Sequence, residues 1–144
     1  MSVDHDSIKA NDLFVEGKRL HDAGKYEEAI ASYDKAIEIK PKFADVWDSK
    51  GDALRGLEKY EEAIASYDKA IEIDPKSLRA WRLRGLALAE LGRYDDAIAS
   101  FDKAIEIDPK HGFAWRRKGD SLAKLGRYDD AIVSFDKAIE IDPK

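Results

Sequence analysis

Hydrophobic residues recur at intervals of three and four along this chain, in stretches that are separated by polar breaks. In residues 78–91 the stripe is made by Ala80, Trp81, Ala87, Leu88 and Leu91. A second stripe with the same spacing fills residues 97–105. Such spacing places the apolar side chains on one face of a helix. The pattern therefore predicts two consecutive amphipathic helices.

Residues at the ends of these stretches mark where the helices begin and end. Gly92 suits the left-handed conformation that often follows a helix. Asp95 and Asp96 suit a first turn, where carboxylates oppose the positive end of the helix dipole. Asp108 precedes Pro109 and is disfavoured in the α region, so the second helix ends there. Residues 78–111 are thus predicted to form an antiparallel helical hairpin.

The same hairpin pattern repeats along the chain every 34 residues. A unit of this size cannot bury its apolar face alone, so neighbouring units must stack into a solenoid with a shared core. The predicted fold class is all-α. Residues 1–9 are expected to be partly disordered or to form the start of the first helix, and the four repeats are predicted to span residues 10–43, 44–77, 78–111 and 112–144. The residues that keep the interval are Pro41, Pro75, Pro109 and Pro143; Trp47, Trp81 and Trp115; Gly17, Gly51, Gly85 and Gly119; and Tyr26, Tyr60, Tyr94 and Tyr128.

Small residues in each unit predict close helix packing. Gly85 and Ala97 would let the two backbones approach, while Trp81 and Phe101 fill the space beside them. We therefore interpret the tryptophans as core residues and not as an aromatic cluster that binds a ligand.

This residue set resembles the tetratricopeptide repeat family. The resemblance covers residues 10–143 and implies a right-handed superhelix of helical hairpins, whose first helices line a concave groove and whose second helices face outward. It also implies binding of peptides or partner proteins, and no catalysis. The residues of the third unit that carry the resemblance are Trp81, Gly85, Leu88, Tyr94, Ala97, Phe101, Ala104 and Pro109.

Two positions depart from the family pattern. Leu13 replaces the tryptophan in the first unit. Glu58 stands where the other units have glycine, and a left-handed conformation there would cost about 1 kcal/mol. We therefore expect the second turn to be reshaped, with Gly56 taking the place of the missing glycine.

The two ends of the array differ. Asp12 and Arg19 stand where inner units carry small apolar residues, so the first repeat is predicted to be a true N-terminal cap. Residues 125–144 copy residues 91–110 with one change, Val133 for Ala99, and no solvating helix follows. The chain is thus expected to be an excerpt of a longer array or an engineered one. An exposed face here would invite a homo-oligomer; its residues are Ile132, Val133, Phe135 and Ile139.

The family geometry implies which side chains line the groove. The second unit would contribute an acidic patch, and the third and fourth units a basic strip that binds carboxylates of an acidic peptide. Phe14 and Phe113 would be apolar contacts. Alternatively, the charges pair across helices, Asp48 with Arg82 for example, and only solvate the groove. The predicted peptide-binding residues are Phe14, Lys18, Asp45, Asp48, Asp52, Arg79, Arg82, Phe113, Arg116 and Arg117.

One known binding mode of the family is rejected. The clamp that grips the C-terminal carboxylate of chaperones uses lysine and asparagine on one first helix, asparagine on the next, and lysine and arginine on the third. The clamp can be aligned so that it starts at the first or at the second repeat of this chain. In each alignment at most one basic residue is suitably placed. The matching positions are Phe14, Lys18, Ser49, Arg79 and Leu83, or Asp48, Asp52, Leu83, Phe113 and Arg117.

Composition narrows the function classes further. Charged residues make up 38% of the 144 residues and the net charge is −5, which argues against nucleic acid. There is no cysteine, so disulfides and thiolate metal sites are excluded. No run is long enough to span a membrane and residues 1–10 are too polar for a signal peptide, so we expect a cytoplasmic protein.

Catalytic chemistry is not expected either. His5, His21 and His111 are isolated, and no phosphate-binding loop or metal-ligand spacing is present. We therefore predict no enzyme activity, no metal and no cofactor. The favoured function is a protein-interaction module that binds a peptide of acidic character. The alternative is a structural scaffold that stacks end to end, and RNA binding through the basic strip is the weakest hypothesis.

Overall fold

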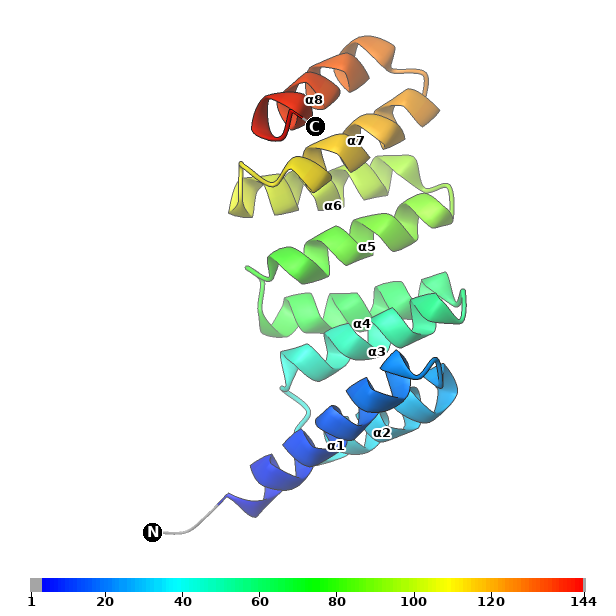
Figure 1. Cartoon of the computed structure of the whole chain (residues 1–144), viewed down its shortest axis with the longest axis vertical. Helices are drawn as coiled ribbons and strands as arrows, with labels where there is room; N and C mark the ends of the chain where they lie inside the picture. Colours follow the sequence, from blue (N-terminus) through cyan, green and yellow to red (C-terminus); the bar gives the residue numbers. More distant parts are fainter. Residues whose placement is uncertain (1–3, 144) are drawn as a thin grey trace. The chain divides into compact units, whose positions relative to one another are not determined.

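The computed structural model describes residues 4–143, and every regular element in that range is an α-helix. The chain divides into two compact units, residues 1–75 and 76–144, which are described separately. Figure 1 labels the helices, which are α1 (His5–Asp22), α2 (Tyr26–Ile39), α3 (Ala44–Gly56) and α4 (Tyr60–Ile73) in the first unit, and α5 (Leu78–Glu90), α6 (Tyr94–Ile107), α7 (Gly112–Lys124) and α8 (Tyr128–Ile141) in the second.

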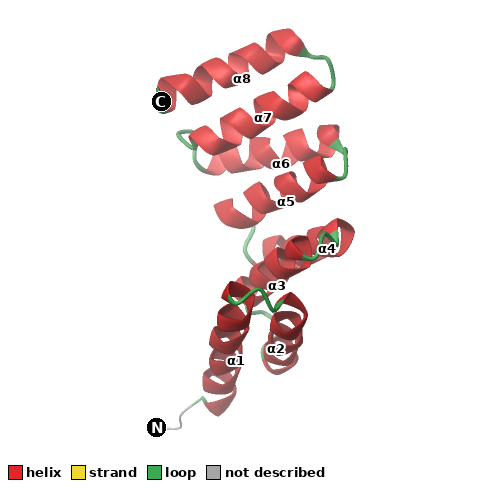
Figure 2. Ribbon diagram, turned by 45° about the vertical axis from the view of Figure 1, so that its right-hand side comes forward, coloured by secondary structure: helices red, strands yellow, loops and turns green. Residues whose placement is uncertain are grey.

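Consecutive helices pack against each other within each unit. In the first unit α1 packs on α2, α2 on α3 and α3 on α4; in the second, α5 to α8 follow the same order. Figure 2 shows α5 beside α6 and α7 beside α8, each pair joined by a tight turn. The predicted all-α fold of antiparallel helical hairpins is confirmed.

The turn inside each hairpin depends on one left-handed residue. Gly92 has φ +76°, and its N–H donates to the Ala89 carbonyl at 3.0 Å. The N–H of Arg93 donates to the Leu88 carbonyl at 2.9 Å. Glu58 adopts the same conformation with φ 61°, and the next N–H, of Lys59, donates to the Leu54 carbonyl at 2.9 Å. The expectation that this turn is reshaped was therefore wrong.

Gly56 does not replace the missing glycine, because it is the last residue of α3. A Cβ atom on Gly56 would lie 2.9 Å from the Tyr26 ring. Its role is to admit that ring.

Glycine inside the first helix of each hairpin admits an aromatic ring from the second. A Cβ on Gly85 would lie 2.6 Å from a ring carbon of Phe101, which real structures do not tolerate. Phe101 is fully buried. The ring therefore lies directly over the glycine backbone, as in the other three hairpins, where the pairs are Gly17 with Tyr33, Gly51 with Tyr67, and Gly119 with Phe135.

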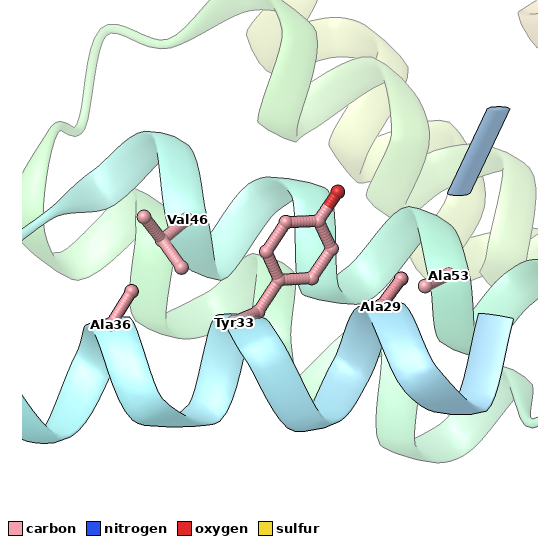
Figure 3. Packing of buried hydrophobic residues seen from close by; sticks show 5 residues of the cluster. All are labelled: Ala29, Tyr33, Ala36, Val46 and Ala53. Carbon is pink, nitrogen blue, oxygen red and sulfur yellow. The ribbon is translucent and has the colours of Figure 1, made fainter. Parts of the chain in front are cut away.

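Small residues also make the contact between one hairpin and the next. In the first unit, Val46 and Ala53 of α3 lie against α2 in a single buried cluster (Figure 3). Their partners on α2 are Ala29, Tyr33 and Ala36. Val46 and Ala53 are both fully buried. The core thus continues from hairpin to hairpin, as a stacked array requires.

The tryptophans are half-buried, so their interpretation as core residues needs correction. Trp47 donates its indole N–H to the Pro41 carbonyl at 2.9 Å, and Trp115 donates to the Pro109 carbonyl at 2.9 Å. These bonds tie the first helix of a repeat to the loop before it. The interval of 34 residues therefore reflects a loop contact in addition to packing.

At the N-terminal end, helix α1 begins at His5 and is capped by Asp4, whose side chain accepts the Ser7 N–H at 3.1 Å. Residues 5–9 are therefore the start of the first helix; the rest of that segment, residues 1–3, lies outside the described residues. Asp12 and Arg19 are both exposed. No helix within residues 4–143 is long and apolar enough to cross a membrane.

Candidate functional site

Every predicted peptide-binding residue lies on the first helix of a hairpin. Phe14 and Lys18 lie on α1, the three aspartates on α3, Arg79 and Arg82 on α5, and the remaining three on α7. They fall into two groups, one in each unit.

In the first unit, Phe14 is used largely for internal packing. Its ring centroid lies 5.1 Å from that of Phe43 and 6.1 Å from that of Tyr33, and it adjoins the buried cluster of α2 and α3. The Lys18 ammonium sits 4.7 Å from the centre of the Phe14 ring. The two residues thus form one amphipathic contact, in which Lys18 is exposed and Phe14 is half-buried.

The three aspartates of α3 do not form one open acidic patch. Asp45 is exposed, whereas Asp48 is only 6% exposed. Asp52 is half-buried and accepts the hydroxyl of Tyr67 at 2.6 Å. Burial and the Asp52 carboxylate together raise the pKa of Tyr67 far above its usual range, so the hydroxyl stays a donor. One aspartate of the patch therefore has a structural partner that the sequence did not indicate.

In the second unit, the structure gathers three arginines around one aromatic ring. The guanidinium carbons of Arg82, Arg116 and Arg117 lie 5.6, 5.4 and 5.5 Å from the centre of the Phe113 ring. Arg82 comes from α5 and the others from α7, so the α5–α6–α7 stacking brings them together. We call these four side chains the arginine cluster. Exposed Arg79 lies one turn before Arg82 on α5.

Little negative charge offsets this cluster. Arg117 Nη1 lies 3.5 Å from Asp120 Oδ2, in an ion pair between side chains that are 40% and 49% exposed. Such pairs contribute about 0–1 kcal/mol. Within residues 76–143, neither Arg82 nor Arg116 forms an ion pair. Three cations and one carboxylate leave a local charge of +2.

Beside the cluster lies a residue that the sequence analysis set aside. The His111 ring centroid is 6.1 Å from that of Phe113. Burial, with Arg82 as the second cause, lowers the pKa of His111 below its usual 6.5. Because an isolated histidine at a repeat junction has no sequence signature, only the fold reveals this neighbourhood.

Two buried nitrogen atoms of this region lack hydrogen-bond partners among the described residues. They are Arg82 Nε and His111 Nε2. A buried polar atom without a partner costs about 1–3 kcal/mol. A ligand or ordered water that reached them would recover that cost.

Two hollows adjoin the cluster. One, of about 640 Å³, lies between α5 and α7 and includes Leu86, Tyr94, Arg117 and Lys124 in its lining. The other, of about 700 Å³, lies between α7 and α8 and includes Phe113 and Arg116. The arrangement can bind an anionic chain with apolar side groups. Among the described residues, no group of three or more acidic or histidine side chains could hold a metal ion.

Comparison with family models gives one consistent result. Models described as tetratricopeptide repeat match residues 49–112 and 113–144, and a model described as TPR repeat matches residues 17–50. Together they match residues 17–144. No curated protein matches the sequence.

Solved structures of MamA are similar to the chain. A crystal structure of MamA is 27% identical, with a TM-score of 0.90, covering 93% of this chain and 78% of that one. One titled MamA MSR-1 C2 is 26% identical with a TM-score of 0.84, covering 98% and 81%. MamA 41-end from Desulfovibrio magneticus RS-1 is 23% identical with a TM-score of 0.87, covering 93% and 76%, and shows the fold alone. The predicted class of fold, an all-α repeat solenoid, is confirmed.

Proposed function

Because the chain belongs to the tetratricopeptide repeat family, whose domains generally mediate protein–protein interactions, we propose that it binds a segment of a partner protein that carries acidic side chains. The observation that supports this proposal is the arginine cluster. Three guanidinium groups around one ring form a local excess of positive charge on a chain whose net charge is −5.

The chemistry of the cluster favours carboxylates. Each guanidinium presents a planar fork of donors that matches a carboxylate, and charge-assisted hydrogen bonds of this kind are about twice as strong as neutral ones. The ring of Phe113 holds the three groups near each other before a ligand arrives. A ligand carboxylate would therefore relieve repulsion between cations and satisfy their donors together.

The acidic group of the first unit does not have the same character. Asp48 is buried and Asp52 accepts a hydroxyl, so of the three only Asp45 is well exposed. We therefore place the main recognition of the peptide in the second unit. Phe14, Lys18 and Asp45 are secondary candidates, and Arg79 is a candidate extension of the cluster.

A peptide-display selection tests this proposal. The variant Arg82→Gln with Arg116→Gln removes two charges and keeps an unbranched polar side chain at each position. The matched control is Arg93→Gln with Arg127→Gln, which removes two exposed arginines that precede α6 and α8. Selection on the unmodified chain should enrich peptides with clustered Asp and Glu. Their affinity should fall by at least about tenfold in the first variant, since each charged hydrogen bond contributes about 1.5–3 kcal/mol.

The control variant should bind such peptides as the unmodified chain does. If the selection enriched no acidic peptides, or if both variants lost affinity equally, the arginine cluster would not be the binding site.

A second candidate function is supported by a different observation. Helix α8 exposes large apolar side chains on its outer face: Ile132 is 56%, Val133 58% and Ile139 58% exposed. These residues favour association through α8, as expected of a stacking scaffold.

A further inference from the structure

His111 differs from the residue that holds its position one repeat earlier. That residue, Ser77, caps α5, because its side chain accepts the Ala80 N–H at 3.2 Å. His111 is the N-cap residue of α7 but forms no such side-chain hydrogen bond. Its ring lies beside that of Phe113, with 6.1 Å between the two centroids. The imidazole thus belongs to the surroundings of the arginine cluster and not to the helix cap.

The first unit shows which contact these positions make there. Phe14 and Phe43 stand two repeats before Arg82 and His111, respectively. The ring centroids of Phe14 and Phe43 lie 5.1 Å apart, in an edge-to-face contact. In the second unit a guanidinium and an imidazole replace this apolar pair. The exchange introduces one permanent cation and one group that titrates near neutral pH.

Cations lie on two sides of His111. Arg82 acts on the imidazole from α5 through its charge. Arg116 and Arg117 of α7 lie 5.4 and 5.5 Å from the centre of the adjoining Phe113 ring. Each of these charges makes a proton on the imidazole less favourable.

Carboxylates offset these cations only in part. Asp108, which follows α6, favours a proton on His111, but its effect is smaller than that of Arg82. Its Oδ1 atom also accepts the Lys110 N–H at 3.1 Å. Two further carboxylates belong to the surrounding elements, namely Asp120 of α7, which pairs with Arg117, and Asp142 after α8. The electrostatic balance at the ring therefore opposes its protonation.

Burial acts in the same direction. His111 Nε2 is buried and has no hydrogen-bond partner among the described residues, and the same is true of Arg82 Nε. Burial, followed by the charge of Arg82, lowers the pKa of His111. A proton on Nε2 would be a buried donor without an acceptor beside a guanidinium. Without a ligand, His111 is therefore largely neutral above about pH 6.5.

An anion bound at Arg82 changes this balance. A carboxylate that accepts hydrogen bonds from the guanidinium would bring a negative charge close to the imidazole. An opposite charge within about 4–6 Å favours the protonated form. The complex then binds a proton more strongly than the free protein does, and linkage requires that a lower pH strengthens the complex.

We propose that His111 is a proton-dependent part of the acidic-segment site, in which a carboxylate of the partner segment bound at Arg82 also stabilises protonated His111. This inference rests on the proposed function, because it requires an acidic ligand at the arginine cluster. Affinity should rise as the pH falls through the range in which His111 is protonated in the complex but neutral in the free protein. The Asp and Glu side chains of the ligand stay ionised above about pH 5.5, so they do not contribute to this rise.

Calorimetric titration tests the inference. The probe is the tightest-binding acidic peptide of the display selection, synthesised with blocked termini and without histidine. It should bind about 3- to 10-fold more tightly at about pH 5.5 than at about pH 8. At about pH 6.5, titrations in two buffers of different ionisation enthalpy should show net proton uptake on binding. In NMR spectra the imidazole signal of His111 should titrate at a higher pH when the peptide is bound.

Variants assign the proton to His111. His111→Phe introduces the residue that the first unit has at this position, so it keeps a ring beside Phe113 but binds no proton. Its affinity should not depend on pH and should stay within about threefold of the value of the unmodified chain at about pH 8. His111→Gln, a second variant without an added ring, should also lose the pH dependence. The control His21→Gln changes a histidine of the first unit and should keep both the pH dependence and the proton uptake.

The possible failures can be told apart. Equal affinities across the pH range without proton uptake would overturn this inference, and the acidic-peptide proposal would stand if Arg82→Gln with Arg116→Gln still removed binding. A pH dependence that persisted in both His111 variants would assign the proton to another group and would also overturn it. If no acidic peptide bound at any pH, both proposals would be wrong.

Discussion

Replacing Glu58 with glycine should stabilise the protein. Glu58 is the only non-glycine residue with positive φ among the described residues, at 61°, while glycines at the corresponding positions have φ between 76° and 78°. A left-handed conformation costs a non-glycine residue about 1–2 kcal/mol. Glycine gives back about 0.5–1 kcal/mol through its greater freedom in the unfolded chain. The free energy of unfolding should therefore rise by about 0.5–1 kcal/mol.

No other change in the turn offsets this gain. The side chain of Glu58 is exposed and forms no ion pair within residues 4–75. The N–H of residue 58 donates to the Arg55 carbonyl at 2.9 Å, and glycine keeps that hydrogen bond. For a chain of 144 residues the melting temperature should rise by about 1–4 °C.

Urea denaturation followed by circular dichroism would measure the effect, with Glu58→Ala as the control for loss of the side chain. Alanine keeps the strain, so it should leave stability nearly unchanged. The converse substitution, Gly92→Ala, should cost about 1 kcal/mol from backbone strain alone, because nothing lies within 4 Å of the added Cβ. If Glu58→Gly were neutral or destabilising while Gly92→Ala was destabilising, strain at Glu58 would not be the controlling term.

Three further predictions concern the core and the site. Gly85→Ala should lower the free energy of unfolding by about 1–3 kcal/mol, which is more than the effect of Gly92→Ala, because the added Cβ would lie 2.6 Å from the Phe101 ring. Thermal unfolding measures this loss. Tyr67→Phe should lower the free energy of unfolding by about 1–2 kcal/mol, since it removes the hydrogen bond to Asp52, as denaturant titration would show. Stability should fall as the pH drops below about 6.5, where His111 is protonated in the unfolded chain before the folded one, and His111→Gln should remove that part of the pH dependence.

Each of these has an outcome that would contradict it. Equal costs at Gly85 and Gly92 would mean that the aromatic ring moves freely. A Tyr67→Phe variant with unchanged stability would show that water replaces the hydroxyl as the partner of Asp52. Phe101, which holds the position of Tyr67 in the next repeat, already has no hydroxyl. An unchanged pH profile in His111→Gln would mean that another group titrates there. For His111 the sign follows from its lowered folded pKa: between the folded pKa and 6.5 the unfolded state binds more protons.

Local signals in the sequence were sufficient for the helices and turns. Helix α5 begins at Leu78 and α6 ends at Ile107, next to Asp108, as the spacing and Pro109 predicted. The error at Glu58 has a physical reason. The turn is fixed by hydrogen bonds to Leu54 and Arg55 and by the packing of the flanking helices, which together exceed about 1–2 kcal/mol of strain at one residue.

The candidate site was predictable as a set of positions but not as a set of roles. The family geometry indicated Phe113 and the arginines, and the fold adds that three of these arginines share one ring. It also shows that Asp52 accepts a hydrogen bond from Tyr67 and that His111 lies near Phe113. These differences depend on which side chains of different helices meet, and the spacing within one helix does not contain that information.

The sequence alone determined the repeat, the helical hairpins and the polar character of α1, because periodicity, glycine, proline and charge act within a few residues of each other along the chain. Only the tertiary structure decided that Trp47 and Trp115 donate to loop carbonyls, that Tyr67 donates to Asp52, and that the cations converge on Phe113. Those features arise from helix packing, which brings together residues far apart in sequence and fixes their burial and neighbours.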